Sequence, residues 1–377
     1  MKTDRPLLLY SDSESSPDMR YLSGLAIPDP FPAIVTPSGE KVALLHPLEL
    51  ARARKESRFD RVVATETIRK KVKPRTKRPP MPMLLAAWLR EEGLRQVRVP
   101  AEFPLGMAEA LRKRKIAVQV SAKAIFPERE QKTENELREI RRANRCSADG
   151  LARVREILEA TRIGKGRSLR WGKRTLTSEI LQEEVAIACL RAGGEAGRII
   201  AAGGDQACDP HCEGRGPLAA DQLIIVDIFP RLVSSGYHGD MTRTFLKGRA
   251  NEAQKKLVQT VRQAQRKALQ TVKVGTTGEA VHATVVKYFG EKGYQTSLAG
   301  EVPTGFFHGT GHGLGLAVHE APRVSPGAPA LKMSQVITIE PGLYYPGIGG
   351  CRIEDVVAVD EKRGKLLSNF PYQWEIS

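Results

Sequence analysis

Three segments decide the fold: His308-Gly-Thr-Gly-His312-Gly-Leu-Gly-Leu-Ala-Val-His319-Glu320-Ala-Pro322, Val336-Ile-Thr-Ile-Glu340-Pro-Gly-Leu-Tyr344 and Gly349-Gly-Cys-Arg352-Ile-Glu354-Asp355. The first holds three of the seven histidines within twelve residues, separated by glycines that allow a close approach of the backbone. In the other two segments a glutamate ends a short β-branched or apolar run, which is typical of a strand. Glutamates so placed point from strands into a shared cleft.

Two further acids lie upstream, on either side of an expected hairpin. Asp227 ends the apolar run 223–226, and Asp240 opens the segment Gly239-Asp240-Met-Thr-Arg-Thr-Phe245. Together the acids and one histidine supply four carboxylates and one imidazole, which is a ligand set suited to two divalent cations that share carboxylates. The predicted ligands are Asp227, Asp240, His312, Glu340 and Glu354.

Length and charge limit the class of protein. A chain of 377 residues can bury a sizeable core and predicts two domains. The formal net charge of +16 raises nucleic acid or an anionic surface as a partner. The basic residues are spread widely and are not interleaved with aromatic residues as a base-stacking surface requires. The composition therefore favours a basic enzyme, with nucleic acid as the disfavoured alternative partner.

The cysteines and the hydropathy pattern indicate a cytoplasmic protein without a membrane partner. The five cysteines have no regular spacing, so we expect free thiols in a reducing compartment. Cys208 and Cys212 lie four positions apart, but no second ligand pair accompanies them, and structural zinc is disfavoured. The apolar run at the N-terminus is too short for a signal peptide, and no apolar stretch is long enough to span a bilayer.

The first third of the chain predicts a small α/β domain, residues 1–131. A strand is expected at 7–10, a short helix capped by Asp18 after it, and a hairpin at 33–45. A basic, proline-ended connector follows at 69–80, favoured as a solvated loop over a phosphate site. Helices at 83–92 and 102–113 then alternate with strands at 96–99 and 116–120. This part contains no cluster of acids and histidines.

The remainder, residues 132–377, predicts a second domain that carries the chemistry. Apolar spacings of three and four predict a long helix over 134–158. Further helices are expected at 177–190, with Thr177 as cap, and at 251–272 and 278–292. Strands are expected at 199–202 and 223–226, and His211 lies in the loop between them.

The acid and histidine segments resemble those of the pita-bread metallopeptidases, in particular Xaa-Pro aminopeptidases (aminopeptidase P) and Xaa-Pro dipeptidases (prolidases). The resemblance covers residues from about Lys132 to the end. It implies a C-terminal pita-bread (creatinase/aminopeptidase-like) domain of mixed α/β (α+β) class, behind a smaller N-terminal α/β (creatinase N-terminal-like) domain. It also implies that Asp240 and Glu354 bridge the metals, that His211 and His319 contact substrate, and that His308 and Arg352 shape the pocket.

The implied activity is removal of the N-terminal residue from peptides with proline in second position, by a metal-bridged hydroxide. Four carboxylates nearly cancel the charge of two dications, and both metals stabilise hydroxide near neutral pH. Glu340 is the candidate general base, and a neutral His319 is the candidate for polarising the carbonyl. One imidazole among oxygen ligands favours Mn(II), with Co(II) or Zn(II) as alternatives. The expected partners are peptides with a free N-terminus and a second copy of the chain in a homodimer.

Two alternatives stay open: a methionine aminopeptidase-like activity, and a pita-bread module that binds peptide or nucleic acid without catalysis. The second would be marked by lost ligands, and none is lost. One departure from the family pattern concerns the segment between Asp227 and Asp240, which is two residues longer than usual. It has Phe229-Pro230 where a glycine is usual, so we expect the hairpin to bulge or widen.

Overall fold

The computed structural model describes residues 5–72, 79–300 and 302–377. It divides into two compact units, Met1–Pro127 and Glu128–Ser377. The mixed α/β class that the sequence predicted is present in both units. The predicted domain boundary between residues 131 and 132 lies shortly after this division.

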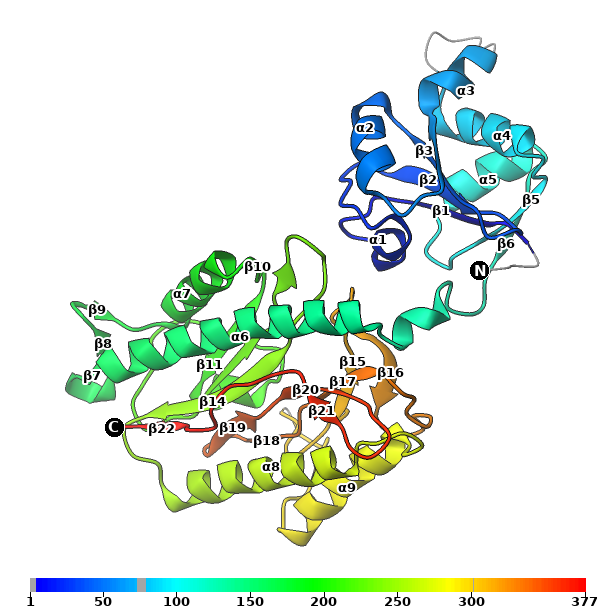
Figure 1. The fold of residues 1–377 in the computed structure, drawn as a ribbon. Coiled ribbons are helices and arrows are strands. Elements are labelled where there is room, and N and C mark those ends of the chain that lie inside the picture. The colour runs from blue at the N-terminus through cyan, green and yellow to red at the C-terminus, as the bar shows by residue number, and fades with distance from the viewer. Residues whose placement is uncertain (1–4, 73–78, 301) are drawn as a thin grey trace. The chain divides into compact units, whose positions relative to one another are not determined.

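The N-terminal unit is a six-stranded mixed sheet with helices on both faces. Its strand order is β4-β3-β2-β1-β5-β6 (Figure 1). β1 runs antiparallel to β2 and parallel to β5, and β2 and β3 form the predicted hairpin. The strands are β1 Leu7–Ser11, β2 Phe31–Val35, β3 Lys41–Leu45, β4 Arg61–Ala64, β5 Gln96–Val99 and β6 Ala117–Val120.

Alternation of side chains along the strands builds one core on each face of this sheet. Leu8, Ile34 and Leu44 face a cluster that includes Trp88, whereas Leu7, Ala33 and Leu45 face a second one. Residues two apart on a strand share a face, so each strand supplies both cores. The helices are α1 Pro17–Ser23, α2 Pro47–Glu56, α3 Thr65–Lys71, α4 Met81–Glu91 and α5 Leu105–Lys113.

Two local predictions in this unit are wrong. The cap of α1 is Ser16, whose hydroxyl accepts from the backbone N–H of Met19, because Pro17 already occupies the first helical position and needs no acceptor. The start of the predicted connector, residues 69–71, is the last turn of α3, whose C-terminal end favours basic side chains. Residues 73–78 of that connector lie outside the described residues.

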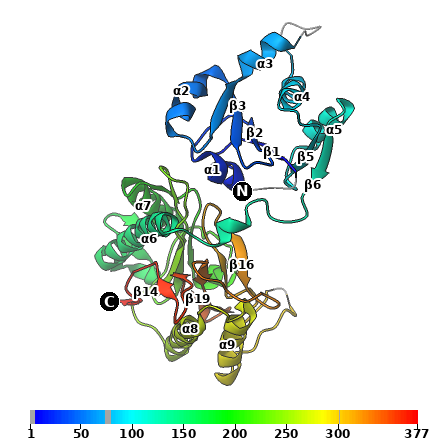
Figure 2. The same cartoon turned by 45° about the vertical axis from the view of Figure 1, so that its right-hand side comes forward.

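The C-terminal unit has two pairs of helices with strands between them. Figure 1 shows α6 Glu134–Ala160 and α7 Ser178–Arg191 on one side, and α8 Glu252–Thr271 and α9 Gly278–Glu291 on the other. The predicted long helix begins at a capping box, in which Thr133 and Glu136 satisfy each other's backbone N–H groups. Thr177 caps α7 as predicted. The 45° view in Figure 2 keeps α6 and α8 on opposite sides.

The strands of this unit form two main sheets. Their orders are β11-β12-β14-β22 and β16-β15-β17-β20-β21. The first comprises β11 Ile199–Gly203, β12 Ile224–Ile228, β14 Met241–Lys247 and β22 Glu375–Ile376; the second comprises β15 Gly311–Gly313, β16 Glu320–Val324, β17 Val336–Ile339, β20 Asp355–Ala358 and β21 Lys365–Leu366. Smaller sheets contain β7 Arg162–Ile163, β8 Leu169–Trp171, β9 Arg174–Thr175, β10 Gly194–Glu195, β13 Arg231–Leu232, β18 Gly342–Tyr345 and β19 Gly349–Arg352.

Each helix pair covers its own apolar core. Leu151, Val154 and Val185 of α6 and α7 pack on Val226 and Phe245 of the first sheet. Val261, Val281 and Val285 of α8 and α9 pack on Ile337 and Val357 of the second sheet. The helices cover the outer faces of the sheets, and the polar side chains of the strands therefore point into the space between the two sheets.

The hairpin between Asp227 and Asp240 does not bulge, contrary to expectation. The antiparallel register that pairs Asp227 with Thr242 continues to Arg231 opposite His238, and the N–H of Leu232 donates to the carbonyl of Tyr237. Pro230 fits because its carbonyl accepts from the N–H of Gly239, a bond that uses no proline N–H. The extra residues therefore lengthen the hairpin and leave the two carboxylates on one face of the β12–β14 pair.

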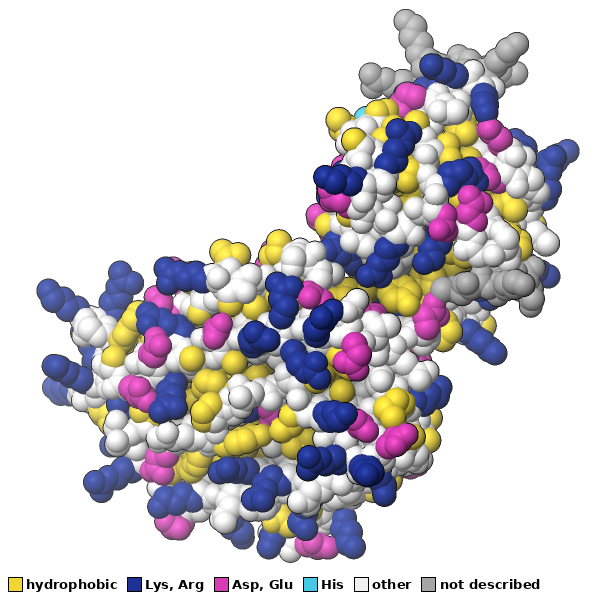
Figure 3. All heavy atoms as spheres, in the orientation of Figure 1, with side chains coloured by type: hydrophobic (Ala, Val, Ile, Leu, Met, Phe, Trp, Pro, Cys, Tyr) yellow, Lys and Arg dark blue, Asp and Glu magenta, His cyan; other side chains and the backbone are white. Residues whose placement is uncertain are grey.

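The surface and the thiols agree with the composition. Figure 3 shows Lys and Arg side chains scattered over the visible face, mixed with acidic and apolar ones. All five cysteines are free, and four of them are buried. Among the described residues, no helix combines the length and the apolar character that crossing a bilayer requires.

Candidate metal centre

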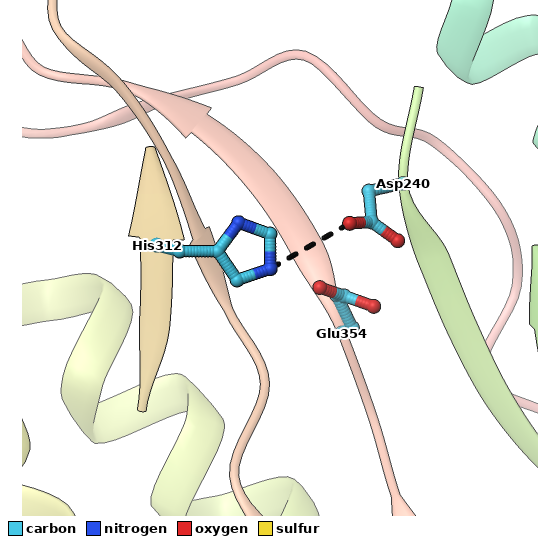
Figure 4. Close-up of side chains that lie close together, drawn as sticks. All are labelled: Asp240, His312 and Glu354. Carbon is cyan, nitrogen blue, oxygen red and sulfur yellow. Dashed lines mark ion pairs between the residues drawn. The ribbon is translucent and has the colours of Figure 1, made fainter. Parts of the chain in front are cut away.

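Three of the predicted ligands meet between the two sheets of the C-terminal unit. Asp240 precedes β14, His312 lies in β15 and Glu354 precedes β20 (Figure 4). One ligand atom from each of these three buried residues lies within 4.8 Å of the other two, a spacing that could hold a metal ion. His312 Nε2 lies 3.7 Å from Asp240 Oδ2. The segments that carry these residues are far apart in sequence, so only the folded chain assembles the group.

Backbone and hydroxyl contacts fix the two acids of this group. The side-chain oxygen of Asn144, on α6, accepts from the backbone N–H of Asp240 at 3.2 Å. The hydroxyl of Thr242 donates to Glu354 Oε2 at 2.8 Å, and the backbone N–H of Glu354 donates to the carbonyl of Thr242. Thr242 therefore joins β14 to the residue before β20, which sets the separation of the two carboxylates.

Glu340 also faces this group, from the end of β17. Its Oε1 lies 3.4 Å from His312 Nε2. Its backbone N–H donates to the carbonyl of Thr310, and the hydroxyl of Thr338 accepts from the N–H of His312 at 3.1 Å. β17 thus holds the imidazole and the glutamate side by side.

Asp227 is held differently from the other predicted ligands. Its Oδ2 accepts from Arg352 Nη2 at 2.8 Å, and the two side chains are 12% and 4% exposed. Its Oδ1 is buried and has no hydrogen-bond partner among the described residues. Arg352 also donates to the hydroxyl of Tyr344 at 3.0 Å, and that hydroxyl lies 2.9 Å from His308 Nε2. A continuous chain of contacts therefore runs from His308 to Asp227.

The charges of the centre favour the binding of cations. Burial, followed by repulsion from neighbouring carboxylates, raises the pKa of Asp240 and of Glu354 well above the usual range. Burial, with the charge of Asp227, also raises the pKa of Glu340 to about 7. The carboxylates repel one another, and Asp227 keeps a buried oxygen that lacks a donor. Divalent cations would neutralise this repulsion, so the donor set fits metal ions.

The remaining predicted histidines border the centre. His211 and His319 are exposed, and the ring of His319 stands edge-on to that of His312 with centroids 4.3 Å apart. Partial shielding of the ring from water, followed by the charge of Arg323, lowers the pKa of His319. Burial lowers the pKa of His308 to about 3, helped by the nearby charge of Arg352. His308 and His319 are thus neutral near pH 7.

Sequence reasoning missed a buried polar network behind Glu354. Arg243 Nη2 lies 2.8 Å from Asp355 Oδ1, and Arg243 Nη1 donates to the carbonyl of Glu354 at 2.6 Å. The amide of Gln265, on α8, and the hydroxyl of Tyr372 both donate to Asp355 Oδ2. The partners of Asp355 lie up to 112 positions away, where no local pattern reveals them.

His282 packs behind the wall of the centre. Its Nδ1 lies 2.9 Å from the hydroxyl of Thr310, and its ring packs on Phe306, which in turn packs on His308. Because the carbonyl of Thr310 accepts from the N–H of Glu340, His282 supports the wall of the centre. The spacing of apolar residues along α9 could have shown only that His282 faces the interior.

A pita-bread fold with a carboxylate-rich centre between its sheets defines a candidate metal-dependent hydrolase. The profile of Metallopeptidase family M24 matches residues 138–361, and the chain belongs to this family.

Individual proteins show the same relationship. An Xaa-Pro dipeptidase of Pyrococcus horikoshii is 40% identical over 147 residues, which span 39% of this chain and 39% of that protein. The matched segment is thus well under half of the relative's length. The prolidase structure of Pyrococcus horikoshii OT3 is 25% identical, with a TM-score of 0.78 over 98% of this chain and 95% of the other. An X-Pro aminopeptidase structure of Thermotoga maritima, 21% identical, shares the fold with a TM-score of 0.82 over 99% and 97% of the two chains.

Proposed function

We propose that this protein is a dinuclear metallo-exopeptidase that removes the N-terminal residue from peptides with proline in second position. The observation that carries the proposal is the buried group of Asp240, His312 and Glu354 beside Glu340, bordered by three further histidines. The Xaa-Pro dipeptidase relative supports the same substrate class. Asp227 would complete the proposed ligand set through its unpartnered Oδ1, while its Oδ2 stays on Arg352.

Bound divalent cations would supply the charge that activates a water molecule and polarises the scissile carbonyl. Glu340 is positioned to accept the proton of that water and return it to the departing nitrogen. His319, neutral and exposed, can donate a hydrogen bond to the oxygen on which negative charge develops. Arg352 and Tyr344 keep Asp227 and His308 in place while the substrate binds.

The finer assignments follow from the donor set and its surroundings. Mn(II) is the proposed metal because oxygen donors dominate, with Co(II) and Zn(II) as alternatives. Proline lacks a backbone N–H, so its site must use shape and apolar contact. Phe307 offers such a wall, packed against Tyr344 with ring centroids 5.4 Å apart. The free thiols support a cytoplasmic location. A homodimer remains a prediction.

Arg323 favours dipeptides among the substrates. It lies directly opposite His312 in the β15–β16 pair, and its charge contributes to the lowered pKa of His319. Its side chain is exposed, and it forms no hydrogen bond or ion pair within the described residues. A guanidinium beside the scissile position is suited to the free carboxylate of a dipeptide. A longer peptide places that carboxylate farther away.

A panel of peptides tests the proposal. We expect the Mn(II)-loaded protein to hydrolyse Ala-Pro and Ala-Pro-Tyr-Ala but not Met-Ala-Ser, and the Asp240→Asn variant to hydrolyse none of them. Cleavage of Met-Ala-Ser alone would instead indicate a methionine aminopeptidase. If the loaded protein cleaves no peptide but binds RNA in a salt-sensitive manner, the binding module is the better description.

The dipeptide preference has its own test. We expect Arg323→Gln to raise KM for Ala-Pro by ~10-fold or more, because a hydrogen bond to a charged group contributes about 1.5–3 kcal/mol. KM for Ala-Pro-Tyr-Ala should change little. Equal effects on both peptides would remove Arg323 from carboxylate recognition.

A further inference from the structure

The loop between β15 and β16, residues 314–319, carries His319 past the metal centre. The imidazole of His319 is exposed and makes no hydrogen bond to any residue in the described ranges. The ring of His319 contacts the ring of His312, and this contact restrains only one side of the His319 ring. The position of this side chain therefore depends on whatever holds the loop.

Glu320 ties the end of this loop to the segment before α6. Its Oε1 lies 2.6 Å from Lys132 Nζ, and its Oε2 lies 2.7 Å from Arg129 Nη2. The Lys132 side chain is 1% exposed, and that of Glu320 13%. A pair this well buried has little competition from water, so it holds its geometry more firmly than a surface pair.

The loop also folds directly over the Glu320 carboxylate. The N–H of Ala317 points at Oε2 from 3.4 Å, and a Cβ added to Gly315 would lie 2.4 Å from Oε1. On the other side, the N–H of His238 in the long hairpin donates to the carbonyl of Gly315 at 2.8 Å. The loop is thus held between the carboxylate and the hairpin.

The hairpin is anchored at the start of α6 as well. The hydroxyl of Tyr237 donates to Glu136 Oε1 at 2.6 Å, and Glu136 belongs to the capping box of that helix. Lys132 lies immediately before the capping residue Thr133, and its backbone N–H donates to the carbonyl of Ser334. The two supports of the loop, Glu320 and the hairpin, are therefore both anchored to residues 132–136, at the start of α6.

We propose that Glu320, held by Lys132, is a positioning residue that sets the place of His319 through the loop 314–319. This inference rests on the proposed function, because the role of His319 belongs to it. The carboxylate of Glu320 is paired with the side chains of Lys132 and Arg129, and it does not act on the substrate. Its loss would let the loop and His319 move while the metal ligands stay in place.

The expected kinetic effect is a loss of kcat with little change in KM. A misplacement of about 1 Å can cost up to ~100-fold in rate, so we expect kcat for Ala-Pro to fall ~10- to 100-fold in Glu320→Gln and Lys132→Met. Lys132→Arg keeps the charge and should recover most of the rate. Bound metal per chain should equal that of the wild type in all three variants.

A matched control separates positioning from general loss of stability. Glu184→Gln breaks the Arg153–Glu184 pair, which has the same 2.7 Å separation but joins α6 to α7 away from the centre. It should leave kcat unchanged. A double-mutant cycle gives the sharper answer: if Glu320 acts through His319, His319→Ala should reduce kcat much less in the Glu320→Gln background than in the wild type. Additive effects of the two substitutions would overturn the inference.

A second measurement does not depend on turnover. Hydrogen exchange of the amides at 315–320 should become faster in Glu320→Gln and stay unchanged in Glu184→Gln. If protection of this loop is the same in both variants, Glu320 does not hold it and the inference is wrong. If the wild type cleaves no Xaa-Pro peptide while exchange still accelerates, the proposed function fails, and the support of the loop by Glu320 stands.

Discussion

Replacing Arg243 by methionine should destabilise the C-terminal unit strongly, because it leaves a buried carboxylate without its cation. The Arg243 and Asp355 side chains are 3% and 1% exposed, and their charged atoms lie 2.8 Å apart. Removing one partner of such a pair costs about 3–5 kcal/mol. Asp355 would keep the donors Ser368, Gln265 and Tyr372. We therefore expect the lower end of that range, ~3 kcal/mol.

The loss should also reach the metal centre. Arg243 donates to the carbonyls of Thr242 and Glu354, so it holds the strand that follows Asp240 against the segment that carries Glu354. Without it, the separation of Asp240 and Glu354 is no longer fixed, and metal affinity should fall. An unchanged helix signal in circular dichroism would show that the C-terminal unit still folds.

Urea denaturation, combined with hydrogen exchange of the β14 and β20 amides, measures this effect in the unit concerned. Glu184→Gln is the control, since its pair with Arg153 is 25% and 34% exposed and such pairs contribute about 0–1 kcal/mol. The double variant Arg243→Met/Asp355→Asn should lose less than Arg243→Met alone, because no unpaired charge remains. A loss in Arg243→Met no larger than that in the control would refute the reasoning.

Three further predictions concern the centre and its support. Asp240→Asn or Glu354→Gln should lose bound metal, counted per chain by mass spectrometry, and all turnover with an unchanged circular dichroism spectrum; an active variant would exclude that residue from the ligands. In the metal-free protein, the pKa of Glu340 of about 7 lies above its unfolded value, so its contribution to stability is present at low pH and lost as pH rises. We expect a loss of ~3 kcal/mol between about pH 4.5 and 7, seen as a falling Tm in EDTA and suppressed by Mn(II). Gly239→Ala should destabilise by about 1–3 kcal/mol in urea, because its Cβ would lie 2.5 Å from the backbone of Ala143, whereas Gly197→Ala meets no atom within 4 Å and should be neutral.

The sequence predicted several features that depend on neighbouring residues. Thr177 caps a helix because a hydroxyl can accept the free N–H groups there, and the spacing of apolar residues followed the long helix α6 almost to its end. Glu340 emerges where β17 ends, as its position after an apolar run indicated. The clustering of Asp240 with His312 and Glu354 was predicted from residue types and a family resemblance.

Features that depend on distant partners could not be predicted in the same way. Lys132 and Glu320 are 188 positions apart, and nothing in the sequence around either residue distinguishes it from a surface charge. The hairpin 228–241 was expected to bulge because Phe229-Pro230 lacks the freedom of glycine. The proline instead keeps one bond of the pair, because its carbonyl accepts from the N–H of Gly239. The sequence did not single out Arg323 either. Its proposed role depends on a side chain that forms no hydrogen bond or ion pair within the described residues, which only the folded chain shows.

The bond from Thr242 to Glu354 joins residues 112 positions apart, and it has a consequence for when activity can first appear. Any centre built across such a span forms late during folding, since distant strands must find each other before the acids meet. Partly folded chains would then hold no competent metal centre. Under the proposed function, copies that are still folding would therefore not trim the exposed N-termini of other new chains.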